Sequence, residues 1–318
     1  MPVDMLASVK NSLKRLPGLR TLVDQRDGAA AEVAELRRQV AAAGFVPAGH
    51  FYSPIPDLDD VARDRDRIFD GDVRELPGID LRDDAQFDLL ASFVAYYDEL
   101  PFTPEPSGGL RYHYENPAYS YCDGILLHCM IRHARPARII EVGSGYSSCM
   151  ILDTDERWFD GSIETTFVEP YPELLRSLLR DDDHARILPE RLQDVDLDEF
   201  RRLAADDILF IDSTHVSKVG SDVNRLVFDI LPILAPGVYV HVHDVHFPFE
   251  YPEVWIEEGR AWNEAYLLRA FLQFNSDFEV VLMSTYVTRF HRDFVAEHLP
   301  LCLRNPGGSL WLRRRTDP

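Results

Sequence analysis

From about residue 121 to the C-terminus, short apolar runs alternate with segments whose apolar residues recur every three or four positions. The short runs predict buried strands, and the longer spacing predicts helices that pack one face against a core. We expect strands at 137–142, 163–169, 185–188, 207–212, 237–244, 278–283 and 309–314. Strands that alternate with helices are typical of an α/β fold with a mostly parallel sheet.

Helical patterns fill most of the gaps between these strands. They follow Ser144 and recur near residues 172–180, 221–234 and 257–274, the last as one long helix. The gap between the final two strands has no clear helical period, so we expect it to be loop-like and only partly helical.

The N-terminal residues 1–45 have helical spacing without strands. Two stripes of apolar residues follow one another. The first consists of Leu6, Val9, Leu13 and Leu16, and the second, within residues 28–44, of Val33, Leu36 and Val40. We expect two helices that dock on the body of the protein or on a second copy, which would make a homo-oligomer. A coiled coil or a membrane-surface helix is the alternative.

Residues 46–120 mix aromatic, proline and aspartate clusters around one predicted helix near 84–100. This composition is typical of a cap or lid with long loops. The sequence therefore predicts three parts: a helical appendage (1–45), a cap segment (46–120) and an α/β domain (121–318).

Charge and cysteine usage narrow the class of protein. The 318 residues include 54 acidic and 33 basic side chains, a formal net charge of −21, which repels polyphosphates and argues against a nucleic-acid partner. The four cysteines form no CxxC pair and lie in apolar surroundings, as expected in a reducing compartment. No apolar stretch reaches 18 residues and the N-terminus lacks a signal-peptide core, so we expect a cytoplasmic protein without a transmembrane segment.

Two glycines follow the first strand of the predicted sheet, in the stretch EVGSGYSSC. Gly143 and Gly145 allow a sharp turn and a close approach of the backbone to a ligand. Glu141 precedes them, where a carboxylate suits a ligand with an ammonium group. Glu169 ends the next strand, at the position where an acidic side chain accepts the hydroxyls of a ribose.

Together with ILFIDSTH after the fourth strand and PGVYVHVHD on the fifth, these residues resemble the class I S-adenosylmethionine-dependent methyltransferases. The resemblance covers residues 121–318. It implies a Rossmann-like, seven-stranded, mostly parallel sheet whose last strand is antiparallel, and it implies S-adenosylmethionine (SAM) as the cofactor. NAD suits the pattern less, because Glu141 would face the pyrophosphate and Ser148 replaces the third glycine. A turn without a ligand is the remaining alternative.

The resemblance also implies roles for individual residues. The methionine end of SAM would contact Glu141, Gly143 and Gly145, with Ser147 helping at the loop, and Glu169 would bind the ribose. Gln193 and Asp194 would contact the adenine, and Asp212 would bind the cofactor near its methyl group.

The fourth and fifth strands end at Asp212 and Asp244, and ligands of open parallel sheets bind at the carboxyl ends of the strands. We expect these aspartates to converge there with His215, His243 and His246. The next histidine inward, at position 241, lies deeper in the fifth strand, so we interpret it as a hydrogen-bonded core residue.

Two chemistries fit this group. In the first, Asp212, Asp244 and His243 bind Mg, Mn or Zn, which lowers the pKa of an acceptor hydroxyl. In the second, His215 or His246 is a general base beside Asp244, and no metal takes part. Val245 stands where a second acidic residue would favour the metal.

Aromatic residues follow the fifth strand and precede the first. They are Phe247, Phe249, Tyr251, Trp255 and Trp262, which either stack on an acceptor or pack as a lid, and Tyr119 and Tyr121, which either cover the cofactor or belong to the core. The sequence thus predicts an O-methyltransferase of a small molecule or saccharide. The alternatives are SAM cyclisation and an inactive binding scaffold.

Overall fold

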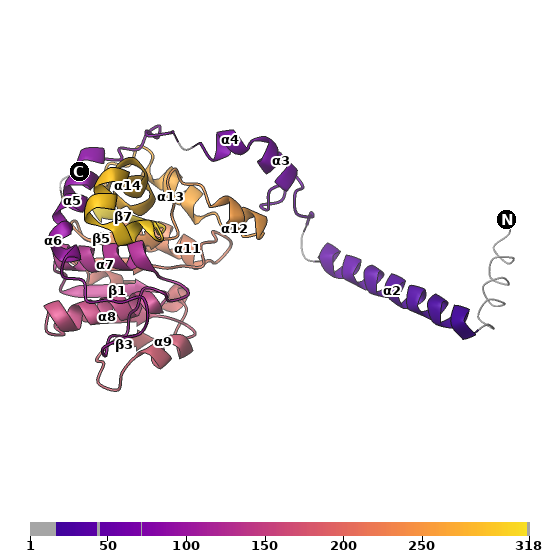
Figure 1. Cartoon of the computed structure of the whole chain (residues 1–318), viewed down its shortest axis with the longest axis horizontal. Helices are drawn as coiled ribbons and strands as arrows, with labels where there is room; N and C mark the ends of the chain where they lie inside the picture. The colour runs from indigo at the N-terminus through magenta and orange to yellow at the C-terminus, as the bar shows by residue number, and fades with distance from the viewer. Residues whose placement is uncertain (1–16, 43–44, 71, 317–318) are drawn as a thin grey trace. The chain divides into compact units, whose positions relative to one another are not determined.

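In a computed structural model of the chain, the described residues are 17–42, 45–70 and 72–316. The chain forms two compact units, Met1–Arg65 and Asp66–Pro318 (Figure 1). Within the described residues, no helix combines the length and the apolar character that crossing a bilayer requires.

The described residues of the first unit include the helices α2 (Pro17–Ala42) and α3 (Leu58–Arg63). The helix predicted within residues 28–44 is confirmed, although it begins earlier, at Pro17. On α2 the apolar residues Leu22 and Val33 are exposed. The stripe from Leu6 to Leu16 lies outside the described residues, as do the side chains of Leu36 and Val40.

The second unit is built on a seven-stranded sheet with the order β3-β2-β1-β4-β5-β7-β6. β7 is antiparallel to both of its neighbours, and the other six strands are parallel to one another, as expected from the sequence. The strands are β1 (Arg138–Val142), β2 (Glu164–Val168), β3 (Arg186–Leu188), β4 (Ile208–Ile211), β5 (Tyr239–His243), β6 (Phe278–Met283) and β7 (Ser309–Arg314).

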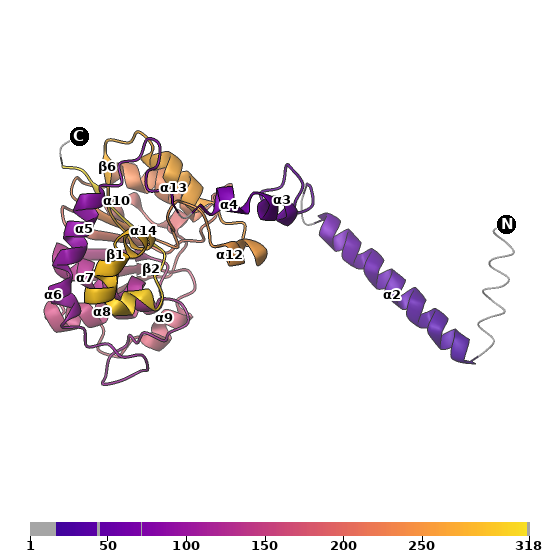
Figure 2. The ribbon, with the colours of Figure 1, turned by 45° about the horizontal axis from the view of Figure 1, so that its top comes forward.

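Helices flank this sheet (Figures 1 and 2), and α7 packs against α8. The α-helices are α4 (Arg65–Ile68), α5 (Asp83–Ser92), α6 (Val94–Tyr97), α7 (Tyr121–Ala134), α8 (Tyr146–Trp158), α9 (Glu173–Leu178), α10 (Leu197–Arg201), α11 (Asp222–Arg225), α12 (Glu253–Glu257), α13 (Glu264–Leu272), α14 (Ser284–Phe290) and α15 (Arg292–His298). The shorter elements are the 3₁₀ turns η1 (Leu192–Asp194), η3 (Leu231–Ile233) and η4 (Pro300–Leu303), and the π-helical turn η2 (Leu226–Ile230).

Every residue of β4 and β5 is buried. Strands at the centre of a parallel sheet are covered on both faces, which explains why β4 reads as a continuous apolar run and why the two histidines of β5 are buried. The two central strands therefore place their ends, rather than their faces, at the accessible edge.

Two helix predictions are wrong in detail. Of the long helix predicted over 257–274, only α13 (Glu264–Leu272) is formed; the short α12 (Glu253–Glu257) ends where the prediction begins, just before Gly259, which adopts a φ of +79°. The gap between β6 and β7 is largely helical, with α14 and α15, rather than loop-like. Its apolar residues pack on neighbours distant in sequence, such as Phe294 on Phe87, so a local period alone did not reveal them.

The segment from residue 66 to 120 packs on the sheet as part of the second unit. Gln86 of α5 is fully buried, its side-chain amide donates to the carbonyl of Leu81, and its oxygen accepts from the backbone of Met283. This side chain thereby joins the segment to the end of β6.

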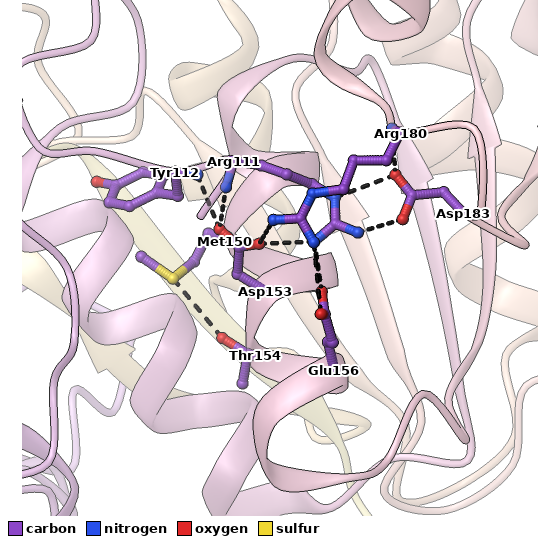
Figure 3. Close-up of polar contacts among 8 residues, drawn as sticks. All are labelled: Arg111, Tyr112, Met150, Asp153, Thr154, Glu156, Arg180 and Asp183. Atoms are coloured by element: carbon purple, nitrogen blue, oxygen red, sulfur yellow. Dashed lines mark hydrogen bonds and ion pairs between the residues drawn. The ribbon is translucent and has the colours of Figure 1, made fainter. Parts of the chain in front are cut away.

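A buried arginine anchors the loop before α7 (Figure 3). The guanidinium of Arg111 forms ion pairs with three carboxylates: Asp183, Asp153 (2.7 Å) and Glu156 (2.8 Å). The carboxylate of Asp153 also accepts hydrogen bonds from the backbone N–H groups of Arg111 and Tyr112. Only 5% of the Arg111 side chain is exposed, against 1% for Asp153 and 7% for Asp183. Arg180 approaches Asp153 only at 3.9 Å, so the two buried carboxylates depend chiefly on Arg111, because buried charges are costly without a partner.

We predict that Arg111→Met destabilises the folded chain by about 3 to 5 kcal/mol, because it removes the cation in direct contact with two buried carboxylates. Urea unfolding monitored by circular dichroism measures this change. The control is Arg201→Met, whose exposed ion pair with Asp198 contributes little. Equal urea midpoints for the two variants would contradict the prediction.

Candidate active site

The turn after β1 approaches the end of β4 very closely. Gly143 has a φ of +77°, and a Cβ atom at this position would lie 2.0 Å from the carbonyl oxygen of Asp212. The backbone N–H of Asp212 donates to the carbonyl of Val142, so the two strand ends are joined just before the turn. Only glycine fits here, for conformational and steric reasons alike.

Glu141 lies beneath this turn rather than at the surface of the cleft. Its side chain is fully buried, and its two oxygens accept hydrogen bonds from the hydroxyls of Ser147 at 2.5 Å and Ser148 at 2.6 Å. Burial raises the pKa of Glu141 to about 8, although both hydroxyls lower it. Glu141 and Ser147 thus fix the first turn of α8, and their direct contact with a ligand stays a prediction.

Glu169 stands beside the same turn, at the end of β2. One oxygen accepts the backbone N–H of Ser144 at 3.2 Å, and the other accepts that of Tyr171 at 2.8 Å. The carboxylate is therefore held in place by two loops, and it keeps further acceptor sites for hydroxyl groups.

The two residues expected at the adenine lie on η1, beyond β3. Gln193 donates from its amide to the carbonyl of Gly220 at 2.9 Å, and Asp194 forms an exposed ion pair with Arg191. Gly145, which precedes α8, has room around it, since a Cβ atom added there would meet its nearest neighbour, Leu174, at 3.7 Å. The adenine contacts stay a prediction.

The ends of β4 and β5 meet as expected from the sequence. His215 lies between the two aspartates, with its Nε2 3.3 Å from Asp212 and 3.7 Å from Asp244. Both His215 and Asp244 adopt a left-handed backbone conformation, at φ values of 59° and 57°. Such values are uncommon outside glycine and are found preferentially where a site requires them.

Glu264 at the start of α13 completes this group, and no local pattern pointed to it because it lies 49 residues from His215. Its carboxylate is 3.0 Å from Nδ1 of His215 and is 2% exposed. Burial lowers the pKa of His215, but the hydrogen bonds with Asp212 and Glu264 outweigh it and raise the pKa to about 10. The ring is therefore an imidazolium at neutral pH.

Asp123 of α7 is a second residue of the group that carried no signal in the sequence. It is buried and accepts the backbone N–H of Gly308 at 3.1 Å, just before β7. Burial raises its pKa to about 6, while the nearby charge of His243 lowers it. Asp123 thus supplies another buried carboxylate near His243 and Asp244.

The three histidines of the fifth strand and its loop differ in their surroundings. His243 is 3.5 Å from Asp244, whereas His241 is fully buried and stacks on Phe210 with ring centroids 4.1 Å apart. The core position of His241 agrees with the expectation, but neither of its nitrogens has a hydrogen-bond partner among the described residues. Nε2 of His246 also has none there, and its ring packs against Gly308.

The aromatic residues divide between the group and the core. Three aromatic rings contact histidines of the group, and the distances join ring centroids. Trp262 is 4.4 Å from His215, and Trp255 packs edge-on to His246 at 5.2 Å. Tyr119 is 5.1 Å from His243. Phe249 is fully buried, and Tyr121 stacks on the buried Tyr114, so these two belong to the core.

The expected metal ligands do not fit a metal ion. In the part of the chain that the structure describes, no three His, Cys, Asp or Glu side chains are arranged to hold one. The imidazolium of His215 stands between Asp212 and Asp244, where it already supplies the positive charge that a cation would bring.

Comparisons with known proteins agree with this geometry. Residues 140–245 match the model of a family described as a methyltransferase domain. An uncharacterized protein of Archaeoglobus fulgidus is 37% identical over 164 residues, which cover 49% of this chain and 73% of that protein.

Two solved structures are distantly similar to this chain. An SAH-bound methyltransferase of Podospora anserina is 13% identical, covering 83% of this chain and 99% of that chain with a TM-score of 0.39. The O-methyltransferase TomG of Streptomyces achromogenes, in complex with SAM, is 16% identical, covering 80% and 96% with a TM-score of 0.39. Likenesses this distant do not assign roles to residues.

We predict that His215 stabilises the fold below its folded-state pKa and not above it. Because that pKa is raised from 6.5 to about 10, the contribution is complete below pH 6.5 and is lost as the pH rises toward 10. The difference in unfolding free energy between the wild type and His215→Gln should therefore shrink from pH 6 to pH 10 in urea titrations. In Glu264→Gln, which removes one of the groups that raise the folded-state pKa, the loss should be complete at a lower pH. A difference that does not change with pH would contradict the assignment.

Proposed function

We propose that this chain, whose residues 140–245 match a methyltransferase-domain family, is a class I S-adenosylmethionine-dependent methyltransferase that methylates a hydroxyl of a small molecule or saccharide at the edge formed by β4 and β5. The proposal is carried by one observation: the glycine turn, Glu169 and the Asp–His group lie at the ends of adjacent strands. The Asp–His group consists of Asp212, His215 and Asp244, together with Glu264. A cofactor at the turn thereby has its methyl group directed at titratable side chains.

The turn and Glu169 support the site of the nucleoside. The backbone at Gly143 and Gly145 leaves room for a ligand to approach, and the fixed carboxylate of Glu169 has acceptor sites for two ribose hydroxyls. SAM also carries a positive sulfonium, and the nearby Asp212 and Asp244 favour a positive charge.

Asp244 is the residue that we propose accepts the proton of the acceptor. From the sequence His215 was a candidate for this role, but an imidazolium with a pKa of about 10 has no free lone pair at neutral pH. Asp244 is 19% exposed, and burial raises its pKa, which makes it a better proton acceptor than an ordinary aspartate. His215 then positions Asp244 and balances part of the charge.

Positioning supplies most of the rate in this proposal. SAM carries an already activated methyl group, so catalysis requires in-line approach of a nucleophile more than it requires a strong base. His246 remains a candidate for orienting the acceptor, since it lies on the loop that follows Asp244.

We predict that S-adenosylhomocysteine (SAH) raises the melting temperature by about 5 to 10 °C at a hundredfold excess over its Kd. Glu169→Ala should lose most of this shift, because the ribose loses its carboxylate, whereas Glu297→Ala on the exposed surface of α15 should retain it. Differential scanning fluorimetry measures both. EDTA should leave the shift unchanged. If SAH has no effect on the wild type, the chain is a binding scaffold instead.

We also predict that the site prefers SAM over SAH, because only SAM carries a sulfonium charge. Asp244→Asn should reduce this preference about 5- to 10-fold, about 1 kcal/mol, the size expected for one charge in a partly exposed site. Isothermal titration calorimetry with both ligands gives the ratio. Asp229→Asn, which alters an exposed pair with Arg225, should not change it. An unchanged ratio in Asp244→Asn would place the methyl group elsewhere.

A further inference from the structure

A cavity opens beside the proposed methyl-transfer site, on the loop that follows β5. Its volume is about 180 Å³, and it is lined by Phe69, Asp70, His246, Phe247, Pro248, Glu250, Tyr251, Pro252, Thr285 and Arg289. We call it the acceptor cavity. A cavity of this size holds several water molecules, and it is large enough for one small ring.

The acceptor cavity adjoins Asp244 through a single glycine. A Cβ atom on Gly308 would lie 2.6 Å from Cε1 of His246, in the wall of the cavity, and 3.3 Å from Cα of Asp244. The backbone N–H of Val245, between these two residues, donates to the carbonyl of Gly308 at 3.0 Å. The cavity wall and the proposed proton acceptor are therefore held at a fixed spacing.

The loop that forms the wall is fixed to α14. The backbone N–H of Phe247 donates to the hydroxyl of Thr285 at 2.7 Å, and the Phe247 ring packs edge-on against Tyr286 and Phe290. The Thr285 oxygen thus acts as an acceptor toward the loop, which leaves its own O–H available as a donor.

The polar groups of the cavity select against charged acceptors. Asp70 and Glu250 carry carboxylates, which accept hydrogen bonds and repel anions. Arg289 donates and repels cations, and it has no ion-pair partner among the described residues. An acceptor that both donates and accepts without net charge satisfies all three.

A flat aromatic acceptor would satisfy these groups poorly. It would cover Arg289 and the oxygen of Glu250 that does not accept from Tyr266 without offering them enough hydrogen bonds, and unpaired polar groups are costly to bury. A sugar ring instead offers hydroxyls along its rim and C–H patches on its faces. The C–H patches match the aromatic and proline surfaces of Tyr251, Pro248 and Pro252.

We propose that the acceptor cavity binds one ring of a glycosyl acceptor, with Glu250 and Arg289 binding ring hydroxyls and another hydroxyl directed at Asp244. This inference rests on the proposed methyltransferase function. In the reaction, the hydroxyl oxygen forms a bond to the methyl carbon, the carbon–sulfur bond of SAM breaks with its electron pair on sulfur to give SAH, and Asp244 takes the proton.

The test uses the full chain with SAM carrying a tritiated methyl group. The probes are the methyl glycosides of glucose, mannose and rhamnose at tens of millimolar, compared with catechol and choline. Saturation-transfer NMR in the presence of SAH reports glycoside binding independently of turnover. We expect at least one glycoside to bind and to acquire the label, and catechol and choline to do neither.

Variants identify the cavity. Glu250→Gln and Arg289→Met should each raise the KM for the glycoside about tenfold, since each removes a charged hydrogen bond, without changing SAH affinity. Arg292→Met, an exposed arginine at the start of α15 outside the cavity, is the matched control. Asp244→Asn should instead lower kcat and leave the KM for the glycoside nearly unchanged.

The outcomes separate this inference from the function on which it rests. If SAH binds but no glycoside binds or reacts, or if catechol alone is methylated, the glycosyl inference is overturned and the methyltransferase function stands. A glycoside that reacts equally well with Glu250→Gln, Arg289→Met and the control overturns the assignment of the cavity. Failure of SAH to bind would overturn the proposed function itself.

Discussion

The contact between the turn after β1 and the end of β4 constrains the rest of this site. Gly143 passes so close to the backbone of Asp212 that no side chain fits between them. This contact brings the place where a nucleoside can lie next to the residue that begins the Asp–His group. The remaining interactions, from the serines that bind Glu141 to the loop that holds Glu169, keep the turn in that position.

The second organising interaction is the imidazolium of His215 among three carboxylates. Histidine in a cleft is usually considered a base, yet here Glu264 on one side and Asp212 on the other keep the ring protonated. The ring then orients the aspartates and offsets part of their mutual repulsion. It also supplies positive charge between the two aspartates, so the same residue changes both the base assignment and the metal assignment.

Much of the fold was predictable because β-strand and helix periods are local. All seven strands, their mostly parallel order and the antiparallel last strand followed from apolar runs, turn residues and a family resemblance. The prediction was less successful after β6, where α14 and α15 are short and their apolar residues pack against distant segments such as the one containing Phe87. Of the long helix expected after β5, only α13 is formed, beyond one glycine with a positive φ, which a helical period does not register.

The sequence by itself determined which residue types occur at the strand ends: the glycines, Glu169, Asp212, Asp244 and the histidines around them. Parallel pairing then requires those ends to share one edge. Only the tertiary structure decided what each side chain does there, because pKa and hydrogen bonding depend on neighbours far away in the chain. Glu264 contacts His215 although it lies 49 residues further along the chain, and Asp123 belongs to α7, before the first strand. Glu141 accepts hydrogen bonds from the hydroxyls of two serines below the glycine turn. Burial and charge are properties of the assembled site, so no local pattern encodes them.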